Sequence, residues 1–182
     1  MKELSLHILD IIENSVSGGA TRIEVNIVTD EIPGLLEIYI VDNGRGMDQK
    51  TLSQVTNPFF TTRTTRKIGM GLSLLKQQAE QTNGRFELES EPGKGTKVYA
   101  SFTIDHFDRQ PIGDLAGVII NCSVSYLNID ILLNIKTLEG AYHFSSDEVK
   151  EILADVPVNS PEVILLLKEM INTNIKDMNM IN

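Results

Sequence analysis

Residues 35–47 read Leu-Leu-Glu-Ile-Tyr-Ile-Val-Asp-Asn-Gly-Arg-Gly-Met. The apolar run before Asp42 predicts a buried strand, and the glycines after it end that strand. Gly44 and Gly46, two positions apart, let the backbone turn tightly and approach a flat ligand closely. Asp42, at the strand end, could accept a hydrogen bond from an exocyclic amine such as that of adenine. The same Asp-Asn-Gly sequence is also common in ordinary turns.

The segments around this strand predict an alternation of helices and strands. Residues 1–17 carry apolar side chains at helical spacing and are followed by two glycines, so we expect a helix there. Residues 22–28 alternate polar and apolar side chains, as a half-buried strand does. We expect the later elements to be a short helix over 48–56, a helix from about 71 to 81, and a hairpin with strands at 85–90 and 96–104.

The first predicted helix carries a polar stripe. His7, Asp10 and Asn14 are spaced by three and four residues, so they share one side of the helix. Such a stripe, flanked by Leu and Ile, is typical of a helix that faces a ligand. The alternative is the ordinary solvent face of an amphipathic helix.

A basic island lies within this acidic chain. Residues 49–79 hold five Lys or Arg side chains and no Asp or Glu, although the whole chain has a net charge of −9. Glycines follow the island at the start of a predicted helix, where free N–H groups and the helix dipole favour a phosphate. The island suits a small polyphosphate, or it is a chance cluster on a solvated loop. The residues concerned are Arg63, Arg66, Lys67, Gly69 and Gly71.

In their order and at their distances, these segments resemble the GHKL ATPase superfamily. This superfamily includes gyrase B subunits, heat-shock chaperone ATPases, sensor histidine kinases and MutL. The resemblance spans about residues 4–104. Residues 57–62 and 90–96 are most similar to the histidine kinase branch, whereas residues 13–15 and 19–23 are more similar to the MutL branch.

The resemblance implies a site for ATP and Mg²⁺. Asn14 would ligate magnesium through its side-chain oxygen, and Asp42 would read adenine. Thr96, at a turn that otherwise reads as an ordinary hairpin, would close the adenine pocket, and residues 57–70 would form a lid that orders when nucleotide binds. The other residues implied to line the nucleotide site are Gly44, Gly46, Met47, Phe59, Arg63, Arg66, Lys67, Gly69, Gly71 and Leu72.

The chain departs from the superfamily at the position that activates water. Hydrolysing members carry a Glu four residues before the metal-binding Asn, and here Asp10 stands there, one methylene shorter. An aspartate could still act as a base through a longer contact. None of the three histidines lies in a recognisable phosphoacceptor motif.

We therefore expect a stand-alone kinase that transfers phosphate from ATP to a separate protein, as histidine kinases and anti-sigma serine kinases do. One alternative is an ATPase whose hydrolysis drives a conformational cycle, with Asp10 as its base. Another is a non-catalytic nucleotide sensor. The sequence names neither the partner protein nor the phosphoacceptor, and it leaves homo-oligomers open.

The expected fold class is α+β. Residues 1–107 are expected to form the ATP-binding domain, a two-layer sandwich of a mixed, mainly antiparallel sheet with helices on one face. Residues 108–182, with a net charge of −6, are expected to form a small β-then-α unit of unknown role. In that unit we expect strands at 118–124, 129–137 and 141–144, followed by helices at 145–154 and 160–178.

The composition excludes several classes of protein. A net charge of −9 argues against nucleic-acid binding, which needs a basic face. No apolar run approaches the ~20 residues that span a bilayer, so no membrane partner is expected. The single cysteine, Cys122, cannot form an internal disulfide and is expected in the core. These features indicate a cytoplasmic protein.

Overall fold

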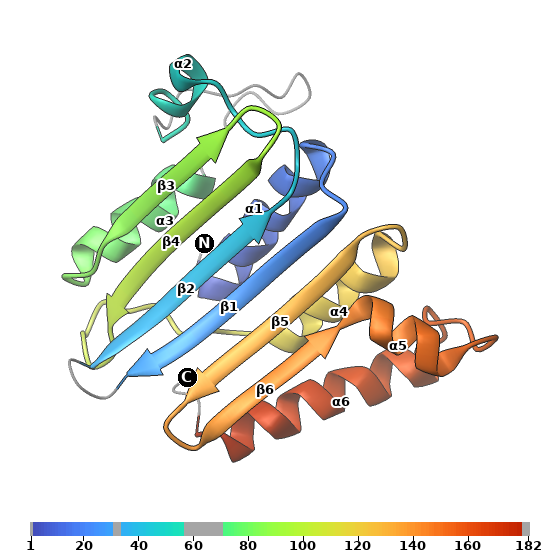
Figure 1. The fold of residues 1–182 in the computed structure, drawn as a ribbon. Coiled ribbons are helices and arrows are strands. Elements are labelled where there is room, and N and C mark those ends of the chain that lie inside the picture. The colour runs from blue at the N-terminus through green and yellow to red at the C-terminus, as the bar shows by residue number, and fades with distance from the viewer. Residues whose placement is uncertain (1, 31–33, 57–70, 180–182) are drawn as a thin grey trace.

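The computed structural model describes residues 2–30, 34–56 and 71–179 of the chain. Within these ranges, six strands form one sheet that is flanked by helices (Figure 1). The strands are β1 (Arg22–Asp30), β2 (Leu35–Asp42), β3 (Phe86–Glu91), β4 (Gly95–Thr103), β5 (Asp130–Thr137) and β6 (Gly140–Ser145). The helices are α1 (Leu4–Ser17), α2 (Gln49–Leu52), α3 (Gly71–Gln81), α4 (Leu115–Ser125), α5 (Ser146–Leu153) and α6 (Pro161–Asp177).

The sheet has the strand order β3-β4-β2-β1-β5-β6. Strands β1 and β5 are parallel, and every other neighbouring pair is antiparallel. This arrangement confirms the expected mixed, mainly antiparallel sheet.

One face of the sheet is covered by helices. In β1, Ile23, Val25 and Ile27 are fully buried, whereas the residues between them are partly exposed. Figure 1 shows α1, α3 and α4 behind the sheet, and the buried side chains of these helices form one hydrophobic core with those of β1. The alternation of side chains along a strand therefore separates an apolar core face from a polar open face.

The start of α1 is closed by the segment that follows β4. The backbone N–H groups of Leu4 and Ser5 donate to the carbonyl groups of Pro111 and Ile112, at 2.9 and 2.8 Å. These contacts satisfy N–H groups that a helix leaves without an intrahelical partner. None of the helices in the described ranges is long and apolar enough to cross a bilayer.

One predicted element is wrong. Residues 118–124 were expected to form an apolar strand, but they belong to α4. Most of α4 is buried, so its sequence has no polar face and no helical periodicity to set it apart from a buried strand. The local signal for a helix is Asp114, whose carboxylate accepts from the Gly117 N–H at 2.9 Å and caps the first turn. Cys122 is buried in this helix.

The remaining elements of residues 108–182 follow the sequence pattern closely. Strands β5 and β6 and helices α5 and α6 begin and end within a few residues of the predicted bounds. Strand β5 lies beside β1, so these residues extend the same sheet. The division of the chain into two domains near residue 107 stays a prediction.

Replacing Leu133 by Ala tests the core at this junction. Leu133 lies in β5, pairs with Val25 and is fully buried. Loss of a buried leucine side chain should lower the free energy of unfolding by about 2–5 kcal/mol, measured by urea denaturation. The matched control is Leu138→Ala, whose side chain is 70% exposed, and which should change stability by about 0.5 kcal/mol or less. Equal effects of the two changes would contradict the core position of Leu133.

Candidate functional site

Four strands are paired in register where β2 ends. Asp42 pairs with Ile23 of β1 and with Thr96 of β4, and Thr96 pairs with Ser90 of β3. Ile23 is fully buried on the face that the helices cover. Because directly paired residues point to the same face of a sheet, Asp42, Thr96 and Ser90 all point toward the helices.

The carboxylate of Asp42 is held from two sides. The Gly44 N–H donates to Oδ1 at 2.8 Å, and the Ser15 hydroxyl donates to Oδ2 at 2.7 Å. Ser15 is buried in α1, and its hydroxyl also lies 3.1 Å from the carbonyl oxygen of Ile11. Each carboxylate oxygen has a further lone pair, so Asp42 can still accept a hydrogen bond from a ligand.

The loop after β2 packs backbone to backbone against the turn between β3 and β4. Gly46 has φ +66°, and a Cβ there would overlap the carbonyl group of Glu91. Gly95 has φ +93°, and a Cβ there would overlap the carbonyl group of Asp42. Both positions therefore require glycine. Residues 92–94 form a hairpin turn between β3 and β4, as the sequence suggests, and this turn also lies directly against the loop that follows Asp42.

Ser90 joins this loop to this turn. Its hydroxyl oxygen accepts from the Met47 N–H at 2.9 Å. The same hydroxyl donates to the Gly95 carbonyl at 2.9 Å and lies 3.0 Å from Thr96 Oγ1. Ser90 thus fixes the position of Thr96 relative to the loop.

The polar stripe on α1 is not a uniform solvent face. His7 is 2% exposed, with Nε2 3.1 Å from Oε1 of Gln110, whereas Asp10 is partly buried and Asn14 is exposed. Burial lowers the pKa of His7, against the hydrogen bond to Gln110 and the charge of Asp10, which raise it. The solvent-face alternative is therefore wrong for His7.

Asp10 lies against the start of α3. A Cβ on Gly71 would collide with Oδ2 of Asp10 and would stand 3.0 Å from its Cγ. The structure therefore brings the stripe on α1 together with the glycine that opens α3. Leu72, the next residue, is 9% exposed and belongs to the core.

Several of the predicted site residues fall in residues 57–70 and lie outside the described residues, as does the whole predicted lid. They are Phe59, Arg63, Arg66, Lys67 and Gly69.

Comparison with protein families matches residues 2–106 to the family described as histidine kinase-, DNA gyrase B-, and HSP90-like ATPases. The matched segment is more than half of the chain. The chain belongs to this family. The match runs from α1 through β4, so it contains every site residue described above, and it ends before α4.

Curated relatives of the chain include sensor kinases. A putative sensor protein of Shewanella frigidimarina is 30% identical over 109 residues, which are 59% of this chain and 17% of that protein. The sensor histidine kinase YxdK of Bacillus subtilis is 32% identical over 108 residues, 56% of this chain and 33% of that protein. The chain thus spans a third or less of these relatives.

A solved structure shares the fold. The crystal structure of the N-terminal domain of a DNA repair protein matches 80% of this chain and 52% of that chain, with a TM-score of 0.57 and 18% sequence identity. At this identity the likeness concerns the fold alone. It confirms the expected α+β class, in agreement with the ATP-binding fold of the family.

Domains of this family generally bind ATP with Mg²⁺, and the described residues fit both groups. A carboxylate with spare lone pairs, Asp42, suits the amino group of adenine. No group of three or more His, Cys, Asp or Glu side chains among the described residues could hold a metal ion alone. Magnesium in a nucleotide site does not need such a group of side chains, because it takes most of its ligands from phosphates and water.

Three residues that shape the site were not predicted as site residues. Ser15 bonds to Asp42, and Ser90 lies within hydrogen-bond distance of Thr96. Asn43 accepts from the backbone N–H groups of Thr21, just before β1, and Arg22, the first residue of β1. Ser15 could have been found from its place beside Asn14, and Asn43 from the tendency of Asn to bond nearby backbone. The role of Ser90 follows only from the strand register.

Proposed function

We propose that this chain binds ATP with Mg²⁺ at the end of β2 and passes the γ-phosphoryl group to a nucleophilic side chain of a separate protein. The new bond to that side chain replaces the bond between the γ-phosphorus and the bridging oxygen, and ADP leaves. The observation that carries the binding step is the Asp42 carboxylate, which is held by Ser15 and Gly44 beside Thr96. An adenine amino group can donate to this carboxylate, whereas the carbonyl group that guanine has at the same position cannot.

The metal would be held by Asn14 together with phosphate oxygens and water. Support comes from the place of Asn14, which is exposed near the end of α1 and precedes the Ser15 that holds Asp42. Bound Mg²⁺ would neutralise charge on the phosphates. On the protein side, Asn14 would contribute a neutral oxygen ligand and orient the triphosphate away from the adenine position.

Support for transfer to another protein comes from the relatives and from Asp10. The relatives that share this domain are named as sensor proteins and a sensor histidine kinase. Asp10 stands where hydrolysing members of the superfamily carry a longer Glu. A carboxylate about 1 Å out of place can cost ~10²-fold in rate, which disfavours water as the attacking group.

One observation favours ATP hydrolysis as a second candidate function. The Asp10 carboxylate lies against Gly71, the first described residue of α3, and the dipole of a helix favours a phosphate at its N-terminal end. An aspartate at this position could still orient water if the phosphate lies closer to it, by about the length of the one methylene that Asp lacks relative to Glu.

The Asp42→Asn change tests adenine recognition. A hydrogen bond to a charged group is worth ~1.5–3 kcal/mol, so ATP affinity measured by calorimetry should fall by about tenfold or more. The matched control is Asp155→Asn, at an exposed loop position between α5 and α6, which should leave affinity unchanged. Unchanged affinity in a folded Asp42→Asn protein would remove the adenine assignment.

The Asn14→Ala change tests the metal assignment. Binding of Mg-ATP should weaken much more than binding of adenosine, which brings neither phosphate nor metal. Asn172→Ala, at an exposed position of α6, serves as the control for a surface amide. Equal losses for Mg-ATP and adenosine would mean that Asn14 has a structural role only.

Variants of Asp10 separate transfer from hydrolysis. For a kinase, hydrolysis by the purified protein should be slow in wild type, Asp10→Asn and Asp10→Glu alike, and label from γ-labelled ATP should move only to a partner protein. For an ATPase, turnover should vanish in Asp10→Asn and rise in Asp10→Glu. Steady wild-type hydrolysis on the order of 10 per second would contradict the kinase proposal. Binding with neither hydrolysis nor transfer would favour a nucleotide sensor.

A further inference from the structure

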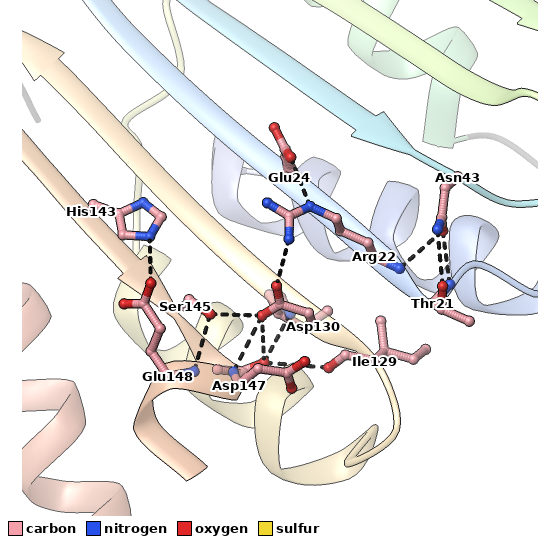
Figure 2. A network of polar contacts seen from close by, with 12 residues as sticks. Thr21, Arg22, Glu24, Asn43, Ile129, Asp130, His143, Ser145, Asp147 and Glu148 are labelled. Carbon is pink, nitrogen blue, oxygen red and sulfur yellow. Dashed lines mark hydrogen bonds and ion pairs between the residues drawn. The ribbon is translucent and has the colours of Figure 1, made fainter. Parts of the chain in front are cut away.

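The loop that follows Asp42 is bonded to Thr21, just before β1, and to Arg22, the first residue of β1. Asn43 Oδ1 accepts from the backbone N–H groups of Thr21 and Arg22, at 2.9 and 3.0 Å. Asn43 Nδ2 donates to the Thr21 hydroxyl at 2.9 Å (Figure 2). These bonds extend the pairing of β1 and β2 past the end of the ladder, so the direction of the chain just after Asp42 depends on Thr21 and Arg22.

The same two residues are bonded on their other side to β5, beyond the segment that matches the family. The Asp130 N–H donates to the Thr21 carbonyl at 2.9 Å. The Arg22 guanidinium donates through Nη1 to Asp130 Oδ2 at 3.0 Å (Figure 2). Thr21 and Arg22 therefore lie between Asn43 and Asp130 and bond to both.

Asp130 is itself held firmly by the start of α5. Asp130 is 8% exposed, and its Oδ1 accepts from the Ser145 hydroxyl at 2.9 Å and from the Asp147 N–H at 3.2 Å. Arg22 is shared with Glu24, whose carboxylate accepts from Nε at 3.0 Å. A buried carboxylate bonded to several donors has little freedom to reorient, so it fixes the guanidinium that it binds.

We infer that Asp130 is a positioning residue for the loop that follows Asp42, residues 43–47, through Arg22, Thr21 and Asn43. We infer further that the segment from β5 to α5 senses whether nucleotide is bound at that loop. The inference rests on the proposed binding of nucleotide at Asp42. Two sites that are coupled in this way affect each other by the same factor. Nucleotide bound at Asp42 must then stabilise the contacts of Asp130 with α5, as much as those contacts strengthen nucleotide binding.

The first arm of the test measures affinity in two variants. Asp130→Asn removes the charge with little change of shape, and Arg22→Met removes the guanidinium at a residue whose side chain is half-exposed. Each should weaken binding of Mg-ADP by roughly three- to tenfold, in line with measured couplings between distant groups. Adenosine affinity should fall by a similar factor, because these hydrogen bonds lead to Asn43, which is next to the Asp42 proposed to bind adenine.

The control breaks an ion pair elsewhere in residues 108–182, which lies outside the segment from β5 to α5 and involves no residue of the loop after Asp42. Lys168 Nζ lies 2.7 Å from Asp114 Oδ2, between α6 and the cap of α4. Lys168→Met should leave both affinities unchanged, even where thermal unfolding shows a loss of stability. This separates positioning from general destabilisation, and Arg22→Met serves where Asp130→Asn fails to fold.

The second arm needs no variant. Amide hydrogen exchange of the wild-type protein should slow at Asp147 and Glu148 when Mg-ADP is added. The slowing should be at most the factor by which the two variants weaken Mg-ADP affinity. Exchange at Ile164 in α6 should not change. Wild-type protein that binds no nucleotide would overturn the proposed function and this inference with it. Wild-type protein that binds, with variants of equal affinity or with unchanged exchange at Asp147 and Glu148, would overturn this inference alone.

Discussion

The geometry at the end of β2 depends on the close approach of two backbones. The first residue of β4 comes so near to the Asp42 carbonyl that Gly95 has no room for a Cβ, and the loop after β2 comes equally near to the Glu91 carbonyl at Gly46. This contact holds the loop after β2 against the end of β3 and the start of β4. It also leaves the side-chain face of Asp42 free to meet Ser15 of α1, so the helix layer and the sheet are joined at that carboxylate.

The sequence predicts the first hundred residues well because each element there carries its own local signal. Strand β1 alternates polar and apolar side chains, and α3 begins at the glycine and ends at the residue that its sequence predicts. Helix α4 carries no such signal, since burial on most sides removes the periodicity that distinguishes a helix from a buried strand. The parallel pairing of β1 with β5 also escapes sequence reasoning, because alternation shows that a strand has a buried face but not which strand lies beside it.

The candidate site divides in the same way. Asp10, Asn14 and Asp42 could be singled out from residue type and spacing, whereas Thr96 was implied only by the resemblance to the GHKL superfamily. The structure places Asp42 opposite Thr96 and Asp10 against Gly71. Ser15, Asn43 and Ser90 act through partners that are 5 to 43 residues away in the chain. Local sequence gives a hint only for Ser15, beside Asn14, and for Asn43, in a turn sequence, whereas the role of Ser90 follows from the register of the strands alone. The roles predicted for residues 57–70 stay predictions.

The parallel ladder between β1 and β5 also bears on how the chain is made. Arg22 and Asp130 are 108 residues apart, and translation at ~5–20 residues per second separates their synthesis by roughly 5–20 s. During that interval the outer edge of β1, with its row of unpaired N–H and C=O groups, has no partner from its own chain. An exposed edge of this kind is a template for pairing with other chains. The late arrival of β5 therefore creates a period in which a nascent chain is open to aggregation or to a chaperone, and the period ends when β5 docks.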